Sequence, residues 1–266
     1  MQTKHTLLQT ITNSKLDVWS QNSVLASLLY VVTRSAINSA VKAIPDLPAE
    51  GAGVDTFTQY EQDCKNIDPE IRAQLASFLD LRNDLADALA QVSDSETRDL
   101  GNTLEFMTST PPNRDSFATE WNRRIRAGMK THGMTMAKFM DIQYASAMDQ
   151  HCTLIAKGEH AVNLLCQLEP AEAELPDWLI EAMFNKAIEK LLGRRDKQVI
   201  RAMNYRLPTE QRIDAETDIE LIDAAIIALG GTVPSDEPET PEAEATTPAV
   251  FRSRLTPEQH AATANA

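Results

Sequence analysis

The feature that most constrains this chain is the spacing of its apolar residues, which repeat with the period of an α-helix as far as about residue 229. In the stretch 16–44 the repeat comprises Leu25, Leu28, Leu29, Val32, Ala36 and Ala40. Steps of three and four place side chains on one face of a helix. The longest strand-like alternation, at residues 56–60, is only five residues long. Because only 9 residues are Gly and 5% are aromatic, the composition also favours helix over sheet.

A second helical repeat has the regular spacing of a coiled coil. Asp68, Pro69 and Glu70 have the residue types of a helix start, since Asp caps, Pro suits the first turn and Glu favours the positive end of the dipole. The following steps of four and three join Ile71, Leu75, Phe78, Arg82, Leu85, Leu89 and Val92. This seam predicts packing against a partner helix. We expect that helix to belong to the same chain, with association of two copies through 71–92 as the alternative.

These patterns predict an all-α protein, a multi-helix bundle of about nine or ten helices. The helices are expected at 16–44, 68–92, 93–107, 115–130, 135–157, 159–168, 177–204 and 217–229, with Gly133, Gly158 and Gly193 as stops or pauses. The sequence at 108–113, Thr-Ser-Thr-Pro-Pro-Asn, breaks the pattern. We therefore predict two packed parts, residues 1–110 and 114–230.

The end of the chain has a different composition. From residue 232 it is rich in Pro, Glu and Thr and poor in apolar residues, so we predict a disordered acidic tail over 232–266. Within it, Phe251 and Leu255 are apolar and Arg252 and Arg254 are basic. We predict that these four residues form a short docking motif on a flexible tether.

Charge and cysteine content limit the partners and the compartment. The net charge is −14, which disfavours binding to nucleic acid and to anionic membranes. Only residues 114–212 are slightly basic, with 15 Lys or Arg and 13 Asp or Glu. The most apolar run, 24–32, is too short for a membrane span of about 20 residues. Three cysteines and no secretory-type apolar start predict a cytoplasmic protein that does not contact membranes.

The stretch 117–151 is the strongest candidate for binding. Phe117, Trp121, Ile125 and Met129 lie four residues apart and predict one apolar face. A separate basic face is expected from Arg123, Arg126 and Lys130, to which Arg124 adds. This arrangement is compatible with nucleic-acid recognition, although ordinary amphipathic helices with solvated arginines have the same pattern.

The second part of this stretch resembles the helix-turn-helix of phage-type repressors. The resemblance covers about twenty residues and rests on Thr135, Ala137, Lys138, Met140, Ile142, Tyr144 and Ser146. It implies a DNA-binding helix in the major groove. The sequence departs from the family at Asp141, where a turn glycine is usual, and at Ala147, where a larger apolar residue is expected.

A second basic cluster comprises Arg194, Arg195 and Lys197, with Arg201 one turn later. Exposed arginines at this position would meet phosphates or an acidic surface, and the chain's own tail is one such surface. A solvated loop is the alternative.

The sequence contains no convincing catalytic, metal or cofactor motif. His151, Cys152, His160 and Cys166 are spaced by one, eight and six residues, unlike the short steps of zinc ligands. We therefore expect small buried cysteines, no metal and no cofactor. The leading prediction is a non-catalytic binding, assembly or adaptor protein that contacts another protein, and the alternative is a nucleic-acid-binding regulator that uses 117–151. A helical enzyme with a site assembled from distant residues remains open.

Overall fold

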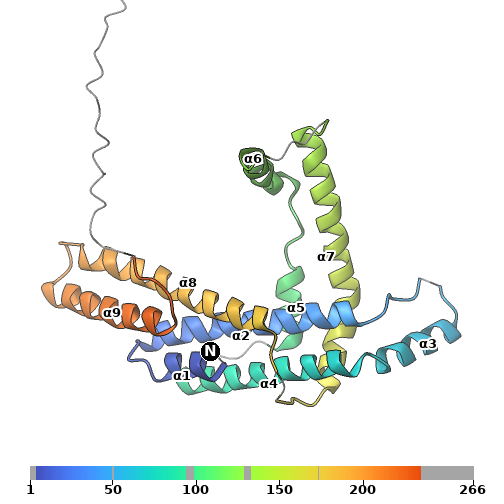
Figure 1. Cartoon of the computed structure of the whole chain (residues 1–266), viewed down its shortest axis with the longest axis horizontal. Coiled ribbons are helices and arrows are strands. Elements are labelled where there is room, and N and C mark those ends of the chain that lie inside the picture. Colours follow the sequence, from blue (N-terminus) through green and yellow to red (C-terminus); the bar gives the residue numbers. More distant parts are fainter. Residues whose placement is uncertain (1–3, 50, 94–98, 129–132, 173, 235–266) are drawn as a thin grey trace, which may run out of the picture. The chain divides into compact units, whose positions relative to one another are not determined.

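The computed structural model describes residues 4–49, 51–93, 99–128, 133–172 and 174–234 (Figure 1). Within them the chain forms nine α-helices and one 3-10 helix, η1, and no strand. The prediction of an all-α bundle is thus confirmed. Residues up to Thr232 cluster as one compact unit, and Val233–Ala266 as another. The predicted tail from residue 235 onward, with Phe251, Arg252, Arg254 and Leu255, lies outside the described residues.

The central helix is α2 (Val18–Ala43), which contacts α1 (Lys4–Thr12), α4 (Pro69–Val92), α5 (Leu100–Thr108), α7 (Met136–Gln167) and α8 (Asp177–Ala202). Its predicted apolar repeat is buried, from Leu25 to Ala40. Asp17 caps the first turn by accepting a hydrogen bond from the Ser20 amide at 2.9 Å. The helix ends at the residue before Ile44-Pro45, because proline disfavours α geometry in the residue that precedes it.

By length and composition α2 is also the one described helix that passes for a membrane span, with a mean hydropathy of 1.4 over 18 residues. Of that window 56% is buried inside the protein. A buried core helix meets the same criteria, and the packing of α2 accounts for its apolar composition. The predicted cytoplasmic location stays a prediction.

The seam of α4 packs within the chain. Leu75, Phe78, Leu85 and Leu89 are buried, and α2 is the helix that α4 contacts most extensively. Ile71, at the start of the seam, is 38% exposed. The helix expected as a partner is therefore α2, and association of two copies through 71–92 stays an untested prediction.

Two predicted helix pauses are wrong. Gly158 lies inside α7, which runs unbroken from Met136 to Gln167, and Gly193 lies inside α8. A Cβ atom at Gly158 would lie 2.6 Å from Cδ1 of Leu104 in α5. This glycine therefore allows two helices to approach closely. The sequence alone does not distinguish such a glycine from one that ends a helix.

Other boundaries also differ from the predictions. Helices α1 and α3 (Val54–Lys65) were not predicted, and α9 (Thr209–Ala228) begins eight residues before the expected start. The hydroxyl of Thr217 donates to the Ile213 carbonyl at 3.0 Å inside α9, so this residue does not cap a helix start. The short helix α5 is capped by Asp99. The predicted division into 1–110 and 114–230 stays a prediction. Helix α2 of the first part packs on helices from both parts.

Candidate protein-interaction surface

The 32-residue helix α7 is buried in only one of its halves. Gly158, Ala161, Leu164 and Leu165 are buried near its end, where the helix packs on α2 and α5. From Met136 to Lys157, Phe139 is the only buried residue. The helices beside that half are η1 (Arg114–Phe117) and α6 (Ala118–Arg126), and both contact α7 (Figure 1). We call residues 113–127 and 134–154 the α6–α7 pair.

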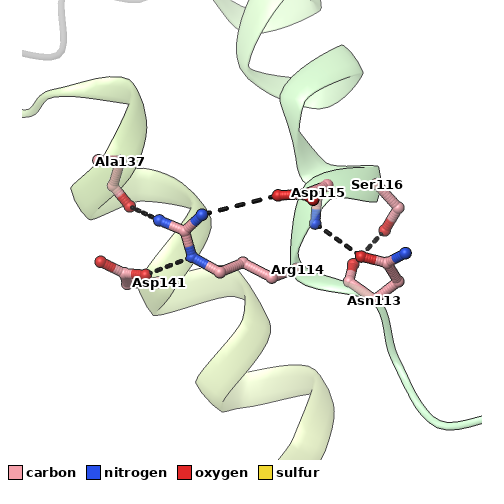
Figure 2. A network of polar contacts seen from close by, with 6 residues as sticks. All are labelled: Asn113, Arg114, Asp115, Ser116, Ala137 and Asp141. Carbon is pink, nitrogen blue, oxygen red and sulfur yellow. Dashed lines mark hydrogen bonds and ion pairs between the residues drawn. The ribbon is translucent and has the colours of Figure 1, made fainter.

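A polar network joins η1 to α7 (Figure 2). The Arg114 guanidinium donates from Nε to the Asp141 carboxylate at 2.6 Å and from Nη2 to the Ala137 carbonyl at 3.5 Å. Asn113 accepts from the Asp115 amide and, through its carbonyl, from the Ser116 hydroxyl, which starts the 3-10 turn and fixes the direction of Arg114. Asp141 is 63% exposed and Arg114 38%, so solvent weakens the ion pair and its main effect is to set the register of η1 on α7.

A small aromatic cluster holds α6 against α7. The rings of Trp121 and Phe139 lie 5.4 Å apart, and the Arg124 guanidinium lies 4.9 Å from the centre of the Phe139 ring. Arg124 also donates to Glu120 at 2.9 Å. Of these side chains only the Phe139 ring is fully buried. The apolar area that α6 and α7 bury together is therefore much smaller than the area buried between the core helices.

The remaining surface of the pair combines exposed apolar side chains with cations. Ile125, Met136 and Ile142 are 50%, 37% and 46% exposed, respectively. Arg126 and Lys138 are exposed as well. These apolar side chains and cations come from α6 and from the end of α7 that contacts α6.

The predicted basic face of α6 is partly neutralised. Arg123 donates two hydrogen bonds of 2.6 Å to Glu120, the residue that Arg124 also contacts. The hydrogen bonds from Arg123 and then Arg124 lower the pKa of Glu120 to about 2. Arg126 has no ion pair among the described residues, and Lys130 and Met129 lie outside them. Of the predicted apolar face, Phe117 and Trp121 are half-buried, whereas Ile125 faces solvent.

The second basic cluster contacts other helices of the chain. Arg194 lies 4.5 Å from the centre of the Trp19 ring and 3.6 Å from the Asp17 carboxylate, both at the start of α2. Lys197 lies 5.5 Å from the same ring. Arg195 is buried and donates to Asp223 of α9 at 2.7 Å. The structure therefore places Arg194, Arg195 and Lys197 where α8 meets α2 and α9, and does not bring them together with the cations of α6.

The described geometry does not form a helix-turn-helix. Residues 136–167 are one continuous helix, so the turn that the resemblance to phage-type repressors requires near Asp141 is not made. Asp141 instead lies on the surface of that helix and pairs with Arg114. Asp141 is also the position at which the sequence departs from the repressor pattern.

The cysteines also differ from expectation. Cys152 and Cys166 lie on the solvent-facing side of α7 and are exposed. Cys64 is half-buried. In the part of the chain that the structure describes, no three metal-binding side chains converge. Sequence reasoning missed Arg114, Asp141 and Phe139 as a group, since no local spacing joins residues that lie up to 27 positions apart.

A cavity of about 300 Å³ lies among Tyr60, Cys64 and His160. The rings of Tyr60 and His160 meet edge to face at 5.5 Å. Burial, followed by the neighbouring Cys64, raises the pKa of the Tyr60 hydroxyl above its usual value. A phenol with a raised pKa stays protonated and is a poor general base.

No protein-family model, curated protein or solved structure matches the chain.

Proposed function

We propose that this chain is a non-catalytic protein-binding or assembly protein and that the α6–α7 pair contacts its partner. The observation that supports this most is the unequal burial of α7, in which the stretch from Met136 to Lys157 buries only Phe139. That stretch contributes little to the core and exposes Ile142 to water. A partner with an apolar face would remove this surface from solvent, which is the main favourable term in most protein association.

The chemistry of the pair also specifies the kind of partner. Arg126 follows Ile125 in α6, Lys138 lies one turn before Ile142 in α7, and neither cation has an ion pair in the described structure. Arginine is enriched at protein interfaces and pairs well with carboxylates. The expected partner surface is therefore an apolar patch with acidic residues at its rim.

Site-specific photo-crosslinking in cells that make the protein tests this proposal. A photoreactive amino acid replaces Ile142 in one variant and Ile213 in the control. Ile213 is 54% exposed on α9, so the two positions are matched in exposure and residue type. We expect a discrete protein adduct at position 142 and none at 213. The same adducts at both positions would contradict the proposal.

The test also separates the two other partners that the sequence allows. A nuclease-sensitive adduct at 142, lost when Arg123, Arg126 and Lys130 are all changed to Ala, would replace protein binding with nucleic-acid binding. An adduct of twice the chain mass would identify a second copy as the partner, and light scattering of the purified protein would then show a dimer.

A further inference from the structure

A groove between α5 and α7 lies outside the surfaces considered so far. Its volume is about 470 Å³, and it is open to solvent. The residues that line it come from one face of each helix: Gly101, Leu104, Glu105, Thr108, Ile155, Glu159, Val162 and Asn163. At a rise of 1.5 Å per residue, the α7 wall from 155 to 163 is roughly 12 Å long, or about two turns.

The floor of the groove is apolar, and its spacing is set by a glycine. Leu104, Ile155 and Val162 supply the apolar side chains. Leu104 lies directly over Gly158, where a Cβ atom would be too close. Beside the groove, Phe106 is 53% exposed and meets the Tyr30 ring edge to face at 5.6 Å.

The charge of the groove has one sign. Glu105 and Glu159 are both exposed, and neither has an ion pair among the described residues. Lys157, the one lysine or arginine between 150 and 167, points elsewhere. Its ammonium group donates to Asp46 at 2.7 Å and to the Ile44 carbonyl at 3.5 Å. The two carboxylates thus line the groove together with its apolar side chains, and no described Lys or Arg lines it.

We propose that this groove binds a short basic amphipathic segment of a partner protein. Its apolar side chain packs on Leu104, Ile155 and Val162, and its Lys or Arg side chains pair with Glu105 and Glu159. Two turns of helix match the length of the groove, and helix-in-groove binding uses anchors at this spacing. The proposal concerns a different surface from the exposed face of the α6–α7 pair and holds whether or not that pair binds a protein.

The test measures binding of a fluorescent synthetic peptide to the full chain by anisotropy. The probe is a helical peptide with leucines at steps of three and four and lysines on both sides. The control peptide has the same leucines and Glu in place of Lys. We expect the probe to bind, the control peptide not to bind, and added salt to weaken the binding.

Paired variants separate the groove from the general acidity of the chain. The double change Glu105→Gln and Glu159→Gln is expected to weaken probe binding roughly fivefold, as the loss of two surface ion pairs predicts. The matched control, Glu210→Gln with Glu216→Gln, removes the same charge from exposed positions on α9 and is expected to leave binding unchanged. Equal weakening by both pairs would overturn the proposal.

A further variant tests the apolar contact. Ile155→Ser removes a half-exposed side chain, so the fold tolerates it, and circular dichroism checks that it does. We expect weaker probe binding, whereas Ile142→Ser, on the α6–α7 pair, should have no effect. Probe affinity that is unchanged by Ile155→Ser, or an absence of probe binding, would overturn the groove proposal without bearing on the crosslinking result.

Discussion

The two halves of α7 share one helix and one apolar periodicity but have different surroundings. In the second half the repeat is buried against α2 and α5, and Gly158 allows α5 to lie close. In the first half Ile142 faces solvent, while Asp141 and Phe139 contact η1 and α6. Helical spacing therefore identifies a face of a helix but does not determine whether the chain itself covers that face.

The largest expected contrast between the halves is in stability. Leu165→Ala removes a side chain that is 1% exposed and should lower the free energy of unfolding by about 3 kcal/mol. Ile142→Ala, in the other half, should change it by less than about 0.5 kcal/mol. Urea unfolding followed by circular dichroism measures both. Similar losses would mean that both halves belong to the core.

A pair of glycine substitutions sharpens the contrast within helix interiors. Gly193→Ala adds a methyl group to an open position, so helix propensity should stabilise the protein by about 0.5–1 kcal/mol. Gly158→Ala gains the same propensity but forces Leu104 to move, and overpacking of this kind costs about 1–3 kcal/mol. Thermal unfolding should therefore show a raised midpoint for the first variant and an unchanged or lowered one for the second. A clear rise for Gly158→Ala would show that α5 does not depend on the glycine.

The ion pair of Arg114 tests how η1 and α6 are held on the outer half. Asp141→Asn weakens an exposed pair, which should cost less than about 1 kcal/mol overall. Because the loss is local, tryptic cleavage after Arg123 and Arg126 should accelerate while global unfolding is unchanged. The matched control is Asp149→Asn, another exposed carboxylate of α7. Equal cleavage rates in the two variants would show that the Arg114–Asp141 ion pair does not hold η1 and α6 on α7.

The smallest effect concerns Glu120, whose pKa the two arginines lower to about 2 from the usual 4.5. A lowered pKa means that the ionised carboxylate favours the folded state. Its contribution is present above pH 4.5 and is lost as the pH falls towards 2. Carbon-13 NMR of the Glu120 carboxyl should give a midpoint near 2, and Arg123→Ala with Arg124→Ala should raise it. A midpoint near 4.5 in the unaltered chain would show that the arginines do not contact it.

Much of the fold follows from local pattern, and the site does not. The repeat at 25–40 and the seam at 75–89 predict the packed pair α2 and α4, because each repeat must cover an apolar face. Helix α3 was missed because it is short and largely exposed, and α1 because it is short and buries only Leu7 and Ile11 among its described side chains. The exposed isoleucines and the Arg114–Asp141 pair depend on which helices become neighbours, and residue spacing along the chain contains no such information.

The basic clusters illustrate the same limit. Arg195 and Arg126 both belong to clusters of basic residues in the sequence, yet Arg195 is buried against Asp223 and Arg126 faces solvent. A buried arginine requires a paired carboxylate, and that partner is 28 residues away. Sequence therefore identified the cations but not which of them are available to a partner.

Amide hydrogen exchange along α7, measured on the full chain by mass spectrometry, tests the central claim most directly. If the first half is held only by η1 and α6, residues 136–155 should exchange on the order of ten times faster than 157–167, because they open without the core. Equal, strong protection from Met136 to Gln167 would contradict the division of α7 into a core half and a half that is available for binding.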